Sequence, residues 1–158
     1  RVNFFLRDPA VQRRCSNLQL RTFKIAGTWD NYARNDMQWD GEHFAYMVTL
    51  SEQKWESFQI LLDGSWDTTY YPSTRDGSPY KEHKLMGPDK QGHGKNWTIG
   101  RAPQDRGEPG CHYLVELSLD ERGLASKVHW HTIRDEAKAV RTEQELRERV
   151  AAAAVQRS

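Results

Sequence analysis

Apolar and polar residues alternate in three short stretches, and this alternation constrains the fold more than any other feature of the sequence. The apolar members at every second position are Phe44, Tyr46, Val48 and Leu50, then Phe58, Ile60 and Leu62, and then Tyr113, Val115, Leu117 and Leu119. Side chains of a β-strand point alternately to opposite faces, so this spacing predicts strands with one buried face. The chain is therefore expected to consist mainly of β-strands.

Further predicted strands flank these three stretches. They are expected over residues 18–26, 37–40, 96–99 and 126–133, with Gly, Pro, Asp and Asn concentrated between them. Some seven short strands at spacings of about 8 to 12 residues are typical of two packed antiparallel sheets. The pattern therefore predicts an all-β antiparallel sandwich.

The composition divides the chain into three parts. Asp8 followed by Pro9 is typical of a helix start, so residues 1–17 are expected to form a short N-terminal helical lead-in. Residues 18–133 contain the predicted strands and would form the β-sandwich domain. Residues 134–158 are rich in Ala, Arg and Glu, and they predict a C-terminal helical extension.

The C-terminal extension carries its own helix signals. Thr142 and Glu145 have the Thr-x-x-Glu spacing of a capping box, which marks a helix start. The apolar stripe that follows is thin, and it consists of Leu146, Val150, Ala153 and Ala154. A stripe of this width buries little surface, so the helix either lies on the sandwich or reaches a partner.

The charge content narrows the class of partner, whereas the cysteine content leaves the cellular compartment open. The 158 residues include 23 basic and 22 acidic side chains, so the bulk charge favours neither nucleic acid nor an anionic membrane surface. No run of about 18 apolar residues is present, and no membrane span is expected. Cys15 and Cys111 could pair or remain thiols, and two cysteines do not indicate the compartment.

The stretch from residue 67 to residue 94 is poor in aliphatic side chains. It contains Pro72, Pro79 and the pair Gly87 and Pro88, all of which favour turns. We expect a long loop there with no more than a short strand. Long loops in compact domains often carry function, so this segment is a candidate for binding a partner.

Three motifs carry a resemblance to a known family. They are Gly27-Thr-Trp-Asp-Asn-Tyr32, Phe58-Gln-Ile-Leu-Leu-Asp-Gly-Ser-Trp66 and Lys95-Asn-Trp-Thr-Ile99. Together they resemble the starch- and glycogen-binding modules of carbohydrate-binding module family 48, such as the glycogen-binding domain of the AMP-activated kinase β subunit. The resemblance covers about residues 21–100. It implies an immunoglobulin-like β-sandwich, to which this chain would add the N-terminal lead-in and the C-terminal α-helix.

The same resemblance implies four carbohydrate-binding residues. Tyr32 occupies the first sugar-stacking position, where the family normally has Trp, and Trp66 occupies the second. Asn96 matches the hydrogen-bonding Asn, and Gln59 stands where the family has Lys. These residue types suit a sugar, because an aromatic ring stacks on its apolar C–H face and amides bond its hydroxyls. In the alternative interpretation, Trp66 caps the end of the sandwich and Tyr32 anchors a loop.

Two histidines on one predicted strand invite a metal-site hypothesis. His129 and His131 are two positions apart, so their imidazoles share a face of the strand. A metal ion needs further ligands, and no Cys, Asp or Glu cluster stands near this pair at helix or turn spacing. We therefore expect surface or packing histidines and no metal site.

The sequence contains no recognisable catalytic arrangement. Asp40, Asp63 and Asp67 could supply a carboxylate pair for hydrolysis. Asp40 and Asp63 each precede Gly, however, and a turn role explains them. No nucleophile, base and orienting group can be assembled, so we expect no enzyme activity, no catalytic residue and no cofactor.

Two functions from different classes remain. The first is a non-catalytic accessory or scaffold subunit of a larger protein complex, with partner contacts through the 134–158 helix and the 67–94 loop. The second is a module that binds α-glucan through the four residues of the family pattern. The departures from that pattern at Tyr32 and Gln59 favour the first function, because a sandwich fold does not imply its ancestral ligand.

Overall fold

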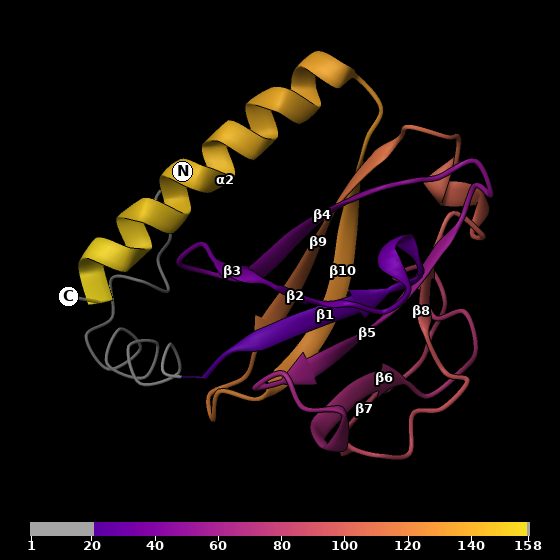
Figure 1. The fold of residues 1–158 in the computed structure, drawn as a ribbon, viewed down its shortest axis with the longest axis vertical. Coiled ribbons are helices and arrows are strands. Elements are labelled where there is room, and N and C mark those ends of the chain that lie inside the picture. Colours follow the sequence, from indigo (N-terminus) through magenta and orange to yellow (C-terminus); the bar gives the residue numbers. More distant parts are fainter. Residues whose placement is uncertain (1–20, 158) are drawn as a thin grey trace.

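The computed structural model describes residues 21–157, which form a sandwich of two antiparallel sheets with one helix after it (Figure 1). The strands of the first sheet are β1 (Phe23–Gly27), β2 (Arg34–Asp36), β5 (Glu56–Leu62), β6 (Thr69–Pro72), β7 (Leu85–Asp89) and β8 (Trp97–Ile99). They follow the order β2-β1-β5-β6-β7, and β8 pairs with β5 outside this path.

The second sheet has the order β10-β9-β4-β3. Its strands are β3 (Gln38–Trp39), β4 (Phe44–Thr49), β9 (His112–Leu119) and β10 (Ala125–Ile133). Short 3₁₀ turns occur at η2 (Thr28–Asp30), η3 (Trp66–Thr68) and η4 (Pro103–Asp105), and the long helix is α2 (Glu136–Arg157). The predicted all-β antiparallel sandwich with a C-terminal helix is confirmed at this level of description.

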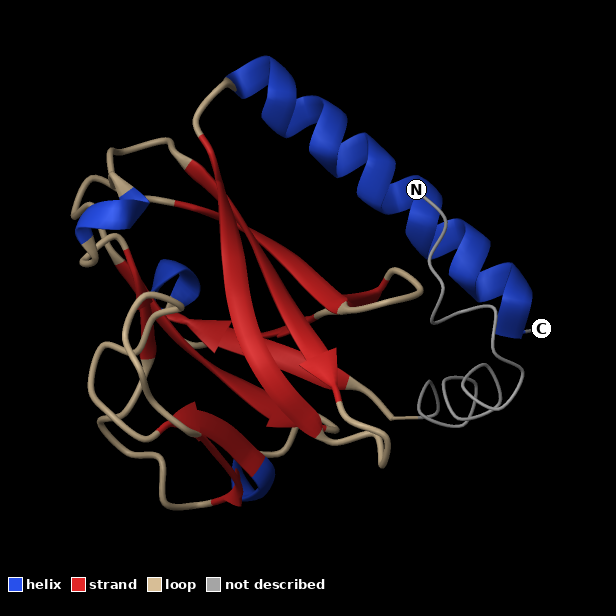
Figure 2. Ribbon diagram, turned by 180° about the vertical axis from the view of Figure 1, so that it is seen from behind, coloured by secondary structure: helices blue, strands red, loops and turns tan. Residues whose placement is uncertain are grey.

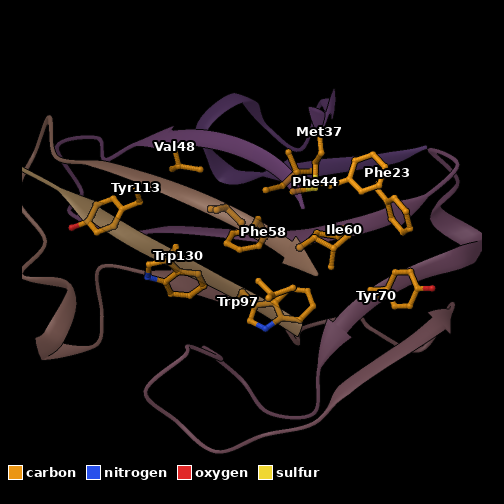
Figure 3. Close-up of a cluster of buried hydrophobic side chains, with 14 of the residues drawn as sticks. Phe23, Met37, Phe44, Val48, Phe58, Ile60, Tyr70, Trp97, Tyr113 and Trp130 are labelled. Carbon is orange, nitrogen blue, oxygen red and sulfur yellow. The ribbon is translucent and has the colours of Figure 1, made fainter. Parts of the chain in front are cut away.

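The main core lies between the two sheets and contains most of the residues that the alternation predicted to be buried (Figure 3), whereas Tyr46 and Leu119 are partly buried at its margin. The Phe58 ring of β5 lies 5.8 Å from the Trp97 ring of β8 and 5.9 Å from the Trp130 ring of β10, measured between centroids. Aromatic packing therefore joins the first sheet to the second. Full burial of one such side chain contributes about 1.5–3 kcal/mol to folding.

Helix α2 packs on the outer face of the second sheet, which points away from the main core. Ala139 and Leu146 of the helix form a second apolar cluster with Ala45, Leu114 and Ile133 of the sheet. Figures 1 and 2 both show the helix running along one side of the sandwich. Of the two predicted alternatives for the thin apolar stripe, the structure shows the one in which the helix lies on the sandwich.

The predicted capping box at Thr142 is wrong, because α2 already begins at Glu136. The backbone N–H of Ala137 donates to Asp135 Oδ1 at 3.1 Å, so Asp135 satisfies a free donor at the helix start. Thr142 lies inside the helix, where its hydroxyl donates to the Lys138 carbonyl at 2.8 Å. Asp and Thr are both favoured at the start of a helix, so residue type alone does not distinguish Asp135 from Thr142 as the capping residue.

The predicted long loop over residues 67–94 is also wrong in part, because β6 and β7 both lie within it. Gly87 and Pro88 argue against a strand in the sequence, yet they belong to β7. This strand stands at the edge of its sheet, where one side forms no ladder hydrogen bonds, and Pro is tolerated there. Gly and Pro therefore do not exclude a strand at the edge of a sheet.

Some predictions concern residues that the structure does not describe. The helical lead-in over residues 1–17 and the thiol of Cys15 lie outside the described part of the chain. Cys111 is buried and forms no disulfide with any residue between 21 and 157. Within that same range, α2 and the other helical segments are too short or too polar to cross a membrane.

Candidate functional site

Gln59 lies in the middle of β5 and points to the outer side of the first sheet. Its neighbours Phe58 and Ile60 belong to the main core, so alternation directs Gln59 the other way. The Gln59 side-chain amide donates to the carbonyl oxygens of Gly92 at 2.7 Å and Lys95 at 2.8 Å. Both amide protons are therefore engaged by the chain's own segment 89–96, and Gln59 is buried beneath it.

The segment that covers Gln59 is anchored at two more points. The Tyr71 hydroxyl of β6 donates to Asp89 Oδ1 at 2.7 Å. Gly92 lies so close to the same ring that a Cβ atom at this position would stand 2.6 Å from Tyr71 Cδ1. Only glycine allows the backbone to approach this closely, so the segment is fitted to the face that the family resemblance assigns to sugar.

Trp66 is the most exposed of the predicted sugar-binding residues. It opens η3, directly after the Asp63-Gly64 turn, and 43% of its surface is exposed. The Ser65 hydroxyl oxygen accepts from the Asp67 backbone N–H at 3.1 Å and caps this turn. A capped turn thus presents the indole to solvent at the corner where η3 packs against β7.

Tyr32 follows η2 in a left-handed backbone conformation with φ 62°, and its side chain is half-buried. Its backbone N–H donates to the Gly27 carbonyl at 2.7 Å, and burial raises the pKa of its phenol. Gly27 pairs with Phe58, whereas Phe23 pairs with Leu62. Tyr32 and Trp66 therefore follow opposite ends of the β1–β5 ladder, which advances about 13 Å over four residues.

Asn96 immediately precedes β8 and is partly buried. Its backbone carbonyl accepts from the Gly77 N–H at 2.9 Å, and the adjacent Lys95 carbonyl accepts from Gln59. The structure thus brings Gln59 and the Lys95–Asn96 backbone together. Within residues 21–157, no ring contact joins Tyr32 to Trp66.

A second group of polar side chains gathers on the outer face of the second sheet. Glu116 of β9 stands directly opposite His129 of β10, and its Oε1 lies 2.9 Å from His129 Nε2 and 2.8 Å from His131 Nε2. Its Oε2 lies 3.6 Å from His43 Nδ1, and that nitrogen lies 3.8 Å from Asp40 Oδ2. Asp40 also shapes the turn before β4, because its Oδ1 accepts the backbone N–H of His43 at 2.7 Å.

The electrostatics of this histidine–carboxylate group favour an ionised glutamate. Burial alone would raise the pKa of Glu116, but the hydrogen bond from His129 and the charges of His43 and His131 lower it to about 2. Interaction with the Asp40 carboxylate raises the pKa of His43, against the effect of burial. Glu116 is therefore negatively charged, and its carboxylate can bind a cation or accept hydrogen bonds.

No further ligand for His129 and His131 stands at helix or turn spacing in the sequence, but the structure brings Glu116 to both histidines. Glu116 lies 13 positions before His129 in the sequence, at neither helix nor turn spacing, and the hairpin of β9 and β10 brings the two together. The signal was present, because a turn at residues 120–123 between two predicted strands implies a cross-strand partner for each histidine. Pairing the two strands in register would have placed Glu116 beside them.

No protein-family model, curated protein or solved structure matches this chain. The resemblance to carbohydrate-binding module family 48 therefore stays a prediction, and so do the roles of the four residues assigned through it.

Proposed function

We propose that this chain is a non-catalytic accessory or scaffold subunit of a larger protein complex. The sandwich would be immunoglobulin-like and related to the modules of carbohydrate-binding module family 48. One observation carries the proposal. Segment 89–96 covers Gln59, in the centre of the face on which the family pattern would place a sugar. A face covered by the chain's own backbone suits a scaffold better than an open ligand surface.

Two surfaces are available to a protein partner. On α2, Val140 and Val155 expose 61% and 74% of their surface, and they lie outside the apolar stripe through which the helix packs on the sheet. On the side of residues 67–94, Tyr80 and Met86 are also exposed, and Met86 belongs to β7, which contacts the 3₁₀ turn that carries Trp66. Exposed aromatic and methionine side chains are typical of protein interfaces.

The proposal is tested by the size of the native assembly and by a surface variant. We expect the protein from gentle extracts to sediment as a complex larger than one chain, with chemical cross-links from α2 to one defined partner. Val140→Glu should release the partner without loss of stability, because the side chain is exposed. The control Glu148→Gln, also on an exposed position of α2, should leave the complex intact.

A monodisperse single chain in native extracts would contradict the scaffold proposal. If the Val140→Glu variant retains the complex, the partner surface does not lie on α2. Mapping the cross-links then decides whether the 67–94 side holds the partner.

We propose glucan binding as a second candidate, because Trp66 offers an exposed indole that can stack on a sugar. Calorimetric titration with a linear or cyclic α-glucan would give binding heat that Trp66→Ala abolishes. Tyr80→Ala is the matched control, since Tyr80 is 45% exposed and lies outside the predicted sugar residues. An absence of heat at millimolar sugar would rule this candidate out.

A further inference from the structure

We propose that Glu116, His129 and His131 form a binding site for one divalent transition-metal ion, with zinc as the preferred metal. The site lies on the outer face of the second sheet, and it does not depend on the proposed scaffold or glucan functions. Its ligands come from two adjacent strands, β9 and β10.

The sheet positions the three ligands without help from a loop. His129 and His131 share one face of β10, and the register places His129 opposite Glu116 and His131 opposite Leu114. One ring nitrogen from each histidine and a carboxylate oxygen of Glu116 all lie within 4.8 Å of one another. Ligand atoms around tetrahedral zinc, with bonds of about 2.0–2.2 Å, stand roughly 3.3–3.6 Å apart. Small rotations of the side chains would therefore admit the ion.

The chemistry of the donors selects the class of metal. Two imidazoles and one carboxylate are the three protein ligands of one class of four-coordinate zinc site, in which water holds the fourth position. Calcium and magnesium prefer sets of oxygen ligands, so they fit this group poorly. In the structure each Nε2 lies at hydrogen-bond distance from Oε1 of Glu116. A bound ion would take the place of the proton in each of these two hydrogen bonds.

Neighbouring groups support the carboxylate and leave a path for the ion. The side chain of Glu116 is only 9% exposed, whereas that of His131 is 58% exposed, so an ion can enter beside His131. His43 Nδ1 is buried without a hydrogen-bond partner among the described residues, and it lies 3.6 Å from the second oxygen of Glu116. It is placed to orient the carboxylate, as outer partners of metal ligands do. Asp40 Oδ2, which lies 3.8 Å from His43 Nδ1, also lies 3.7 Å from Arg149 Nε of α2.

Zinc titration of tag-free protein tests the site, because a polyhistidine tag would itself bind metal. The protein is first treated with a chelator and then freed of it. Calorimetry should give one zinc ion per chain, and magnesium should give no heat. Cobalt should produce the visible absorption of a tetrahedral site, which reports the ligand geometry directly.

Substitutions then assign the ligands. His131→Gln and Glu116→Gln should each weaken zinc binding at least tenfold. His93→Gln, an exposed histidine outside the group, should leave binding unchanged. His131 is largely exposed, so its variant is expected to fold and can be judged alone if Glu116→Gln does not. Equal zinc affinity in His131→Gln and the unmodified chain, or no zinc binding at 100 times the protein concentration, would overturn the proposal.

Discussion

At the scale of single residues, Asp105 shows how one buried carboxylate ties separate elements together. Its Oδ2 accepts from the Gly100 N–H at 2.9 Å, and its Oδ1 accepts from Trp130 Nε1 at 2.8 Å. Its backbone carbonyl accepts from the Tyr113 hydroxyl at 2.8 Å. Burial raises the pKa of Asp105, while the hydrogen bonds from Gly100 and Trp130 act against that rise. The side chain therefore links η4 to β10 and to the end of β8.

We expect Asp105→Asn to lower the free energy of unfolding by about 1–3 kcal/mol, because the new amide nitrogen must face one of two N–H donors and leave it unpaired. Urea unfolding at pH 7 measures the change. Asp67→Asn is the control, since Asp67 is exposed and its substitution should cost less than about 0.5 kcal/mol. Equal stability of the two variants would show that the Asp105 carboxylate is not required.

Asp63 gives a prediction that depends on pH. Burial would raise the pKa of Asp63, but hydrogen bonds from Thr22 and Arg21 outweigh it and lower the pKa. A lowered pKa stabilises the fold above the unfolded value of about 3.9, and this contribution is lost as the pH falls through the folded value. Because the Asp63 side chain is half exposed, Asp63→Asn should cost no more than about 1 kcal/mol at pH 7. Urea unfolding should show this cost shrinking below pH 4, and a cost that grows there would contradict the assignment.

At the scale of elements, segment 89–96 and helix α2 are held in different ways. The segment is fastened by hydrogen bonds from Gln59 and Tyr71 and by the close approach of Gly92. The helix is held by a stripe of apolar side chains that includes Ala139 and Leu146, and by ion pairs of Glu136 with His112 and of Arg149 with Asp40. The hydrogen bonds of the segment are buried or partly buried, whereas the ion pairs of the helix use the exposed side chains of Glu136 and Arg149, and exposed pairs contribute little. The segment is therefore expected to be the more closely defined of the two.

Gln59→Ala should loosen segment 89–96 without unfolding the sandwich. The change removes both donors to the Gly92 and Lys95 carbonyls, and a buried acceptor that loses its partner costs about 1–3 kcal/mol. Hydrogen exchange should speed up in the segment and stay slow in β5. Gln38→Ala, at an exposed position of β3, should change neither. Unchanged exchange in Gln59→Ala would mean that Tyr71 and Gly92 suffice to hold the segment.

At the scale of the whole molecule, one continuous core spans both sheets. Phe58 of the first sheet contacts the rings of Trp29 in η2 and Trp97 in β8. It also contacts the ring of Trp130 in β10 of the second sheet. Because the same side chains serve both sheets, neither sheet keeps a complete core without the other. Residues 21–133 should therefore unfold as one cooperative unit.

Phe58→Ala tests this cooperativity, since it should lower the free energy of unfolding by about 3–5 kcal/mol, a large part of a total near 5–15 kcal/mol. Urea unfolding followed by tryptophan fluorescence and by far-ultraviolet circular dichroism should give coincident transitions that shift together. Tyr80→Ala should leave both transitions in place, because Tyr80 is exposed. Separate transitions from the two probes would show that the sheets unfold independently.

Most of the fold could be predicted, but only part of the candidate sites. The strands around Phe44, Phe58 and Tyr113 follow from local alternation, and the predicted faces contact the main core, but β5 is buried on its other face as well. The edge strand with Gly87 and Pro88 was missed, because its position at a sheet edge is not a local property. For the predicted sugar residues, the residue types of Gln59 and its neighbours say nothing of a covering segment more than thirty positions away.

The alternation of apolar residues by itself indicated an all-β sandwich, because strand geometry acts between neighbours two residues apart, and the composition of residues 134–158 indicated the terminal helix. Only the tertiary structure decided what lies on the outer faces. There, segment 89–96 covers Gln59, and the β9–β10 register places Glu116 against His129 and His131. Such contacts join residues far apart in the sequence, so they depend on strand register and on the path of the chain and not on local conformational preference.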